Sequence, residues 1–119
     1  MVRKSLHVER TFRHDVTDFQ TVYQQAEEVA REVFRRLKLE DLELRTIGIK
    51  IRFKNFETYT RERSLGDYSG ELDPILSSTR ALLKEFEERG TPVRLLGIVV
   101  SQLQTATRAP SSLDSWTRS

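Results

Sequence analysis

Lysine and arginine alternate with apolar residues in one short segment, where single Ile or Phe residues separate Lys50, Arg52 and Lys54. Successive side chains of a β-strand point to opposite faces, so in a strand these three cations would lie on one face. Cations arranged in this way can bind the phosphates of a polyanion. The spacing therefore predicts that this segment binds a phosphate backbone, which we interpret as that of DNA.

The residue types that catalysis or metal binding requires do not gather in the sequence. His7 and His14 are the two histidines, and they are too few and too far apart in sequence for a metal site. The carboxylate pairs at 27–28 and 87–88 fall on the polar sides of helical patterns, which is typical of a solvated surface. The chain has no cysteine, which excludes disulfides, thiolate ligands and cysteine nucleophiles. The sequence therefore predicts a binding domain without catalytic activity of its own.

The charges are divided between two neighbouring parts of the chain, although the formal net charge is only +2. Residues 43–65 hold six basic and three acidic side chains, a balance of +3, whereas residues 66–91 hold three basic and six acidic, a balance of −3. If the first part is sheet and the second is helix, one side of the domain attracts polyanions and the other repels them.

Length and composition favour one soluble domain, since 119 residues with 37% hydrophobic content suffice for a single core. No apolar run reaches the roughly 20 residues that a membrane helix needs, and the N-terminus lacks the apolar stretch of a secretory signal. We therefore expect a cytoplasmic protein with no membrane partner.

Two segments, 17–40 and 72–90, carry apolar residues at intervals of three and four, the period of a helix with one buried side. Thr17 and Gln20 have the spacing of a capping box at the start of the first helix. In the second helix we expect Asp73 as the N-cap, Pro74 at the first helical position and Gly90 in the left-handed conformation that ends a helix.

Four segments, 4–12, 44–53, 58–65 and 93–103, read as strands. The expected order is β-α-β-β-α-β, an α+β fold that forms a four-stranded sheet with two helices on one face and an open basic face. We expect residues 1–103 to form this domain, the loop at 66–73 to join the sheet to the second helix, and residues 104–119 to be a flexible tail.

Alternation predicts which side chains lie on each face of the sheet. Inward positions are expected at Leu6, Val8, Phe12, Ile47, Ile49, Ile51, Phe53, Leu96, Ile98 and Val100. Outward positions are expected at Ser5, His7, Glu9, Thr11, Thr46, Gly48, Lys50, Arg52, Lys54, Leu95, Gly97, Val99 and Ser101. In the third strand Tyr59, Arg61 and Arg63 share one parity, and Thr58, Thr60 and Glu62 share the other. We place the first set outward because burying two unpaired guanidinium groups would be costly.

Three segments in order carry a family resemblance: "RKSLHVERTF" from Arg3, "RTIGIKIRFKNFETYTRERSL" from Arg45, and "PVRLLGIVVSQL" from Pro92. Together they resemble the opening strand, central hairpin and last strand of the little finger domain of Y-family translesion DNA polymerases, in the DNA polymerase IV or DinB-like branch. The resemblance spans about residues 3–103. It implies that the open sheet lies in the major groove of primer-template duplex DNA and grips both backbones.

The resemblance also implies particular phosphate contacts. Lys4 and Ser5 match a Lys-Ser pair at the linker junction, Arg61 and Arg63 match basic positions of the third strand, and Arg94 matches an arginine that opens the fourth. The sequence departs from some relatives at Leu95 and Val99, where they carry basic residues, and at His7, where glycine is common. With the outward positions, the expected DNA-binding set is Lys4, Ser5, His7, Thr46, Lys50, Arg52, Lys54, Arg61, Arg63 and Arg94.

A longer polymerase is implied by the same resemblance. In that family the little finger is the C-terminal domain, whereas a separate palm domain carries catalysis and the Mg²⁺-binding carboxylates. The chain is therefore expected to be an excised piece that cannot extend a primer alone and has no cofactor of its own. Its expected partners are duplex DNA and the palm and fingers domains.

A clamp-binding peptide is a further expectation for the tail. Polymerases of this kind end in a peptide of the form Gln-Leu-x-Leu-Phe that docks on the sliding clamp. The segment "SLDSW" keeps only a leucine, Leu113, and a terminal aromatic residue, Trp116. The alternative is an unstructured end with an incidental tryptophan.

Two other functions fit the same topology. A stand-alone RNA-binding module would present aromatic residues on the sheet for base stacking, and only Tyr59 is a candidate. A protein-interaction or dimerisation domain would use an apolar patch, for which Leu95 and Val99 are candidates.

Overall fold

The computed structural model describes residues 4–106. Its elements follow the predicted β-α-β-β-α-β order. They are β1 (Ser5–Val16), α1 (Phe19–Glu40), β2 (Leu42–Phe53), β3 (Thr58–Ser69), α2 (Leu72–Leu83), the 3-10 turn η1 (Lys84–Phe86), β4 (Val93–Ser101) and the two-residue β5 (Gln104–Thr105). In this part of the chain, no helix is long and apolar enough to cross a membrane.

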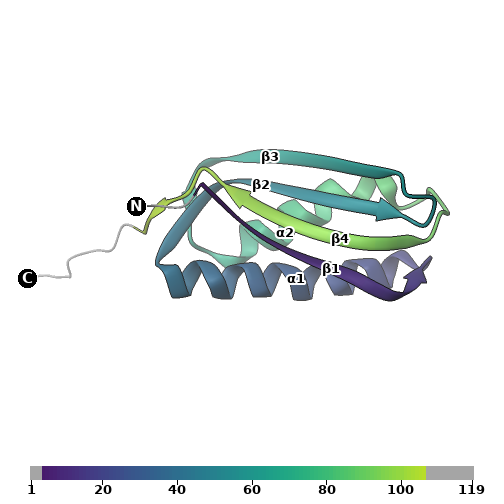
Figure 1. Ribbon diagram of the computed structural model, residues 1–119. Helices are drawn as coiled ribbons and strands as arrows, with labels where there is room; N and C mark the ends of the chain where they lie inside the picture. Colours follow the sequence, from purple (N-terminus) through teal and green to yellow (C-terminus); the bar gives the residue numbers. More distant parts are fainter. Residues whose placement is uncertain (1–3, 107–119) are drawn as a thin grey trace, which may run out of the picture.

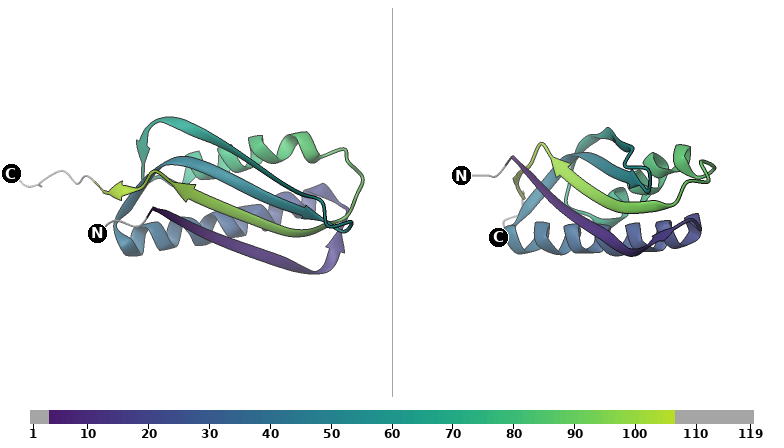
Figure 2. Two further views of the ribbon diagram at one scale, coloured as in Figure 1. Left: turned by 45° about the horizontal axis from the view of Figure 1, so that its top comes forward. Right: turned by 45° about the vertical axis from the view of Figure 1, so that its right-hand side comes forward.

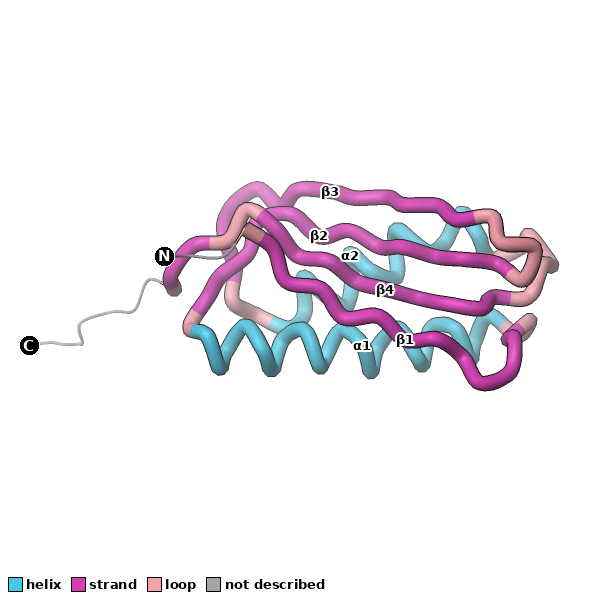
Figure 3. Tube along the Cα trace, viewed as in Figure 1, coloured by secondary structure: helices cyan, strands magenta, loops and turns pink. Residues whose placement is uncertain are grey.

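The strands form an antiparallel sheet in the order β1-β4-β2-β3, as the side-by-side tubes of Figure 3 show. The last long strand, β4, therefore lies between the first two, and β1 and β3 are the edges. Both helices lie on the same side of the sheet, so the predicted α+β fold with one open face is confirmed (Figures 1 and 2).

The inward side chains of the two central strands form the core together with the apolar stripes of the helices. Residues paired across an antiparallel ladder point to the same face, and β2 and β4 pair Ile47 with Val100, Ile49 with Ile98 and Ile51 with Leu96. All six are buried. The predicted inward positions of these strands are confirmed.

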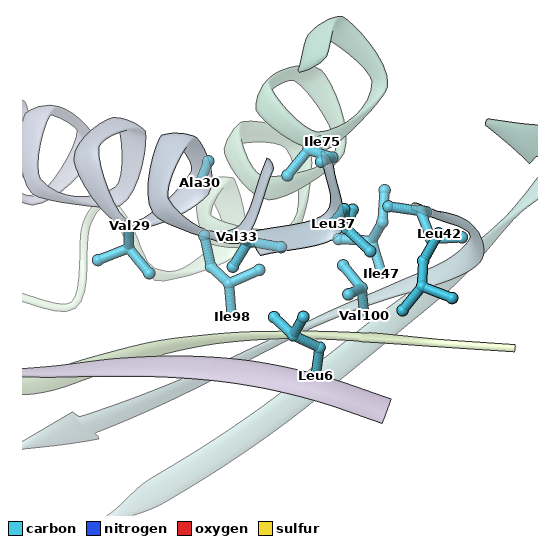
Figure 4. Packing of buried hydrophobic residues seen from close by; sticks show 11 residues of the cluster. Leu6, Val29, Ala30, Val33, Leu37, Leu42, Ile47, Ile75, Ile98 and Val100 are labelled. Atoms are coloured by element: carbon cyan, nitrogen blue, oxygen red, sulfur yellow. The ribbon is translucent and has the colours of Figure 1, made fainter. Parts of the chain in front are cut away.

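Figure 4 shows one end of this core, where Leu6, Ile47, Ile98 and Val100 point from the sheet toward the helices. Their partners on the helix side are Val29, Ala30, Val33 and Leu37 of α1 and Ile75 of α2. A second cluster at the other end includes Phe53, Phe86 and Tyr23. The helices therefore cover the full length of β2 and leave its opposite face open.

Three of the strands are longer than the sequence predicts, whereas β4 ends at Ser101, two residues before its predicted end. β1 continues to Val16, and β3 continues through residues that we expected to form a loop, with an irregular register between the pairs Leu44–Ser69 and Thr46–Ser64. Gln104 and Thr105, expected at the start of a flexible tail, form β5 against Glu43 and Leu42 at the beginning of β2. These polar segments carry no apolar alternation, so their sequence does not indicate a strand. They pair through the backbone N–H and C=O groups that the partner strand offers.

The helix starts also differ from the predictions. The N-cap of α1 is Asp18 and not Thr17: its carboxylate accepts the backbone N–H of Gln20 at 3.1 Å and the hydroxyl of Thr21 at 3.2 Å. The N-cap of α2 is Glu71, which makes no side-chain cap, and Asp73 lies in the first turn. Gly90 has the expected positive φ of 76°, although α2 and the 3-10 turn end before it.

Replacing Asp18 by Ala should therefore lower the free energy of unfolding by about 1 kcal/mol, because the substitution leaves the backbone N–H of Gln20 without its side-chain acceptor. Urea denaturation followed by circular dichroism measures the change. Thr17→Ala is the matched control and should change stability by less than about 0.5 kcal/mol. A larger loss for Thr17→Ala than for Asp18→Ala would contradict the assignment of the cap.

Candidate nucleic-acid interface

The open face of the sheet consists of rows of side chains that cross all four long strands. The registers of β1 with β4, β4 with β2 and β2 with β3 place residues of the same parity side by side. In strand order β1, β4, β2, β3 the rows are Ser5, Ser101, Thr46, Ser64; then His7, Val99, Gly48, Glu62; then Glu9, Gly97, Lys50, Thr60; then Thr11, Leu95, Arg52, Thr58. We call these residues the open-face grid.

A shallow hollow of about 410 Å³ lies in the middle of the grid. Two glycines on the central strands, Gly48 and Gly97, form its floor, and His7, Glu9 and Lys50 are among the side chains around it. A methyl group on Gly48 would lie only 2.9 Å from Cγ1 of Val99 and 3.3 Å from the carbonyl oxygen of Arg61. Val99 therefore occupies the space beside Gly48, and a side chain larger than hydrogen at this position would displace it.

The charges of the grid cancel. Lys50 and Arg52 are its basic residues, and Glu9 and Glu62 are its acidic ones. The prediction of an open basic face is therefore not supported: the sequence pattern of β2 identifies the cations correctly, but the register brings carboxylates from both edge strands beside them.

Both cations of the grid make contacts with side chains of other strands. Lys50 Nζ donates to Oε2 of Glu9 at 3.1 Å, and the two side chains are about equally exposed, at 35% and 37%. Arg52 Nε donates to the hydroxyl of Thr58 at 2.9 Å. Each contact holds a long side chain against the face of the sheet, so that the side chain does not extend into solvent.

The other predicted open-face residues differ in how accessible they are. Lys4, Ser5 and His7 are exposed at the start of β1. Thr46 is only 5% exposed, and its hydroxyl is shared between Ser64 at 3.1 Å and Oε1 of Gln102 at 2.5 Å. Its hydroxyl therefore already has partners within the protein.

Arg61 and Arg63 do not lie on the open face, so their predicted orientation is wrong. They pair with Ile49 and Ile47, whose side chains point toward the helices. Arg61 donates from Nε to Glu85 at 2.9 Å, and its guanidinium lies 5.3 Å from the ring centre of Phe86. The cost of burying a guanidinium group on the helix side of the sheet does not apply here, because β3 is an edge strand and the side chain of Arg61 remains 40% exposed.

Tyr59 has the same orientation as the two arginines. It pairs with Ile51 and packs against Phe53 and Phe86 at ring-centre distances of 6.0 and 5.5 Å. The open-face grid therefore contains no Phe, Tyr or Trp, which counts against base stacking of the kind that single-stranded RNA-binding modules use. Leu95 is only 8% exposed, so the apolar patch considered for dimerisation is small.

Lys54 and Arg94 lie beyond the last row of the grid, at the hairpin end of the sheet. Lys54 is exposed in the turn that joins β2 and β3. Arg94 falls at an irregularity in the register of β4, where it faces Asp15 with an Nε–Oδ1 distance of 3.4 Å and lies 4.7 Å from the ring centre of Phe56. The DNA-binding residues predicted from the sequence therefore do not form one surface. Some lie in the grid, some lie at its two ends, and Arg61 and Arg63 lie on the helix side of the sheet.

The groups with clearly shifted pKa values lie away from the grid. Burial, together with the hydrogen bond to Glu87, raises the pKa of Tyr23 to about 12. Hydrogen bonds from Arg35 and Arg36 lower the pKa of Glu32 to about 2. Both residues are on α1, on the other side of the sheet. Within residues 4–106 no group of three or more His, Cys, Asp and Glu side chains could hold a metal ion.

Sequence reasoning placed Glu9 on the open face but assigned it no role, and it did not place Glu62 there. The alternation of β1 was the signal for Glu9, since Glu9 shares its parity with Ser5 and His7. The signal for Glu62 was the pair Tyr59 and Leu65, which share the opposite parity of β3 and pack against the core. Leu113 and Trp116, predicted to bind a clamp, lie outside the described residues.

A model of the impB/mucB/samB family C-terminal domain matches residues 3–114 of this chain. Curated relatives include the DNA polymerase IV of Methanoculleus marisnigri, 32% identical over 113 residues, and that of Halorhodospira halophila, 37% identical over 106 residues. The matches cover 95% and 89% of this chain, but only 31% and 30% of those proteins. The chain thus spans about a third of the length of these relatives.

Solved structures are also similar to this chain. The little finger domain of PolIV, in a complex with the beta-clamp processivity factor, has a TM-score of 0.68 and 25% identity, with 87% of this chain and 93% of that chain covered. DinB from Sulfolobus solfataricus has a TM-score of 0.72, with 87% of this chain and 29% of that chain covered. Its sequence identity is 11%, so this second likeness concerns the fold alone.

The orientation of Arg61 predicts a structural role. Arg61→Ala should lower the free energy of unfolding by about 1 kcal/mol, because it removes a partly exposed cation–π contact and an ion pair that join β3 to the segment after α2. Arg63→Ala, one row further along the same face, is the matched control and should stay within about 0.5 kcal/mol of the unsubstituted chain. Urea denaturation measures both, and equal stabilities of the two variants would argue against this role.

Proposed function

Since the chain belongs to the impB/mucB/samB family of C-terminal domains, and is a little finger domain of the Y-family DNA polymerase IV type, we propose that its open-face grid binds the phosphate backbones of duplex primer-template DNA. The helices occupy the other side of the sheet and bury its inward side chains. The grid is therefore the one large sheet surface among the described residues that remains free for a ligand.

The observation that carries the proposal is the combination of the glycine-floored hollow with cations beside it. Lys50 lines the hollow and Arg52 lies two residues further along the same strand. A sugar-phosphate backbone needs both features, since it must approach the sheet closely and also find positive charge. Contacts of this type position a duplex without reading its sequence.

The length of β2 fits contacts with two backbones. Thr46, in the first row, and Lys54, beyond the last row, are eight residues apart, a distance of roughly 26 Å at about 3.3 Å per residue. Exposed Lys4 precedes the first row, whereas Arg52 and Lys54 lie toward the hairpin end. A DNA major groove is about 12 Å wide, so cations near the two ends of the sheet can reach the backbones that flank it.

The larger protein of which such a domain forms part is, in this proposal, a DNA-directed DNA polymerase that acts in translesion synthesis and DNA repair in the cytoplasm. Its palm and fingers domains would supply the catalytic carboxylates and bind Mg²⁺. The domain described here would hold the duplex and would not extend a primer alone. The sliding clamp is a proposed second partner, through Leu113 and Trp116, because a similar little finger domain has been solved with a clamp.

The first test is the salt dependence of binding to a short duplex, measured by fluorescence anisotropy. If about four phosphates are neutralised, the logarithm of the affinity should fall with the logarithm of the salt concentration at a slope of about −3.6, with little dependence on DNA sequence. Single-stranded RNA of equal length should bind more weakly. A flat salt response would contradict the proposal.

Reversing the charges of the grid provides the residue-level part of this test. Lys50→Glu with Arg52→Glu should weaken duplex binding at least tenfold and leave the domain folded, because both side chains are partly exposed and the ion pair of Lys50 with Glu9 is weak. Arg31→Glu with Arg36→Glu changes the net charge equally on the exposed side of α1 and is the matched control. Equal losses for the two pairs would mean that net charge, and not the grid, determines the affinity.

A further inference from the structure

An ion pair crosses the middle of the open-face grid. Glu9 on β1 and Lys50 on β2 belong to one row, and only Gly97 of β4 lies between them. The 3.1 Å contact between Lys50 Nζ and Glu9 Oε2 therefore spans the full width of a strand. It joins an edge strand to a central strand through side chains alone.

The crossing depends on the glycine beneath it. A methyl group on Gly97 would lie 3.0 Å from Cγ of Glu9 and 3.6 Å from its Oε2. The side chain of Glu9 thus lies flat over Gly97, in the space that any other residue would fill. The sheet is built so that this carboxylate reaches the cation of the central strand.

We infer that Glu9 sets the affinity of the open face for DNA by holding Lys50 in an ion pair that a phosphate must displace. The inference rests on the proposed function of the grid. A phosphate and the carboxylate are alternative partners for the same ammonium group, because both are anionic oxygen acceptors. Every duplex contact made by Lys50 therefore includes the cost of separating it from Glu9.

The exposure of the pair makes this exchange feasible. Both side chains are more than a third exposed, so water can solvate each partner when the pair opens. An exposed pair of this kind is weak, so it reduces the affinity for DNA without abolishing it. The consequence is a contact that duplex DNA can both form and release.

Glu62 provides a matched comparison on the same face. It lies across the sheet from His7 in the row of Gly48 and lines the same hollow as Glu9. Glu62→Gln removes the same charge from the same surface as Glu9→Gln. The difference between the two variants therefore isolates the contact with Lys50 from the general effect of one fewer carboxylate.

The experiment measures duplex affinity against salt for the unsubstituted chain and for both variants. Glu9→Gln should bind about fivefold more tightly at low salt and steepen the salt slope by up to about 0.9, because the phosphate then meets a Lys50 charge that no carboxylate already compensates. Glu62→Gln should give a smaller gain and an unchanged slope. Glu9→Thr, which suits a strand, repeats the test if the glutamine variant is unstable.

Lys50→Met determines whether Glu9 acts through Lys50. In the Glu9→Gln background it should remove the additional slope of about 0.9. A steeper slope that persists without Lys50, or equal effects of Glu9→Gln and Glu62→Gln, would overturn the inference while leaving the proposed function intact. A flat salt response of the unsubstituted chain would overturn both.

Discussion

The pairing of β2 with β4 is the constraint on which the rest of the structure depends. Ile49 faces Ile98, and the neighbouring apolar pairs follow at every second residue under the helices. A slip of one residue would turn these buried side chains to solvent and bring Lys50 and Arg52 against the helices. The hydrophobic register therefore determines which residues can contact a ligand, even though the buried side chains never touch one.

The same constraint explains which predictions could be made from the sequence. Strands β1 and β2 each carry one mainly apolar and one mainly polar parity, so alternation identifies their faces. The alternation of β4 is weaker, because Leu95 and Val99 lie on its outward parity. In β3 only Tyr59 and Leu65 mark the inward parity, and two arginines share that parity with them. The cost of burying arginine, applied without knowing that β3 is an edge, therefore placed Arg61 and Arg63 on the wrong face.

The candidate site shows a similar limit. The cations of β2 were evident from their spacing, whereas the carboxylate that pairs with Lys50 belongs to β1, 41 positions earlier in the chain. Only the strand order, with β4 between β1 and β2, brings the two side chains into one row. For the same reason, the balance of charge on the open face could not be predicted from the composition of any single segment.

Together these features describe a sheet with separate tasks on its two faces. The helix side contains the apolar core and the arginine–aromatic contacts of the edge, including Arg89, which lies 4.6 Å from the ring centre of Tyr59. The open side combines small residues, two cations and two carboxylates, a composition suited to a backbone contact of moderate strength. Stability and binding can therefore be altered independently.

The most direct test of the central claim is a titration of the isotope-labelled chain with a short DNA duplex, followed residue by residue through its backbone amide resonances. The account predicts that the largest shifts occur at Gly48, Lys50, Arg52 and Gly97, with little change along the exposed side of α1. Shifts concentrated on α1 and α2, with an unchanged open-face grid, would contradict it.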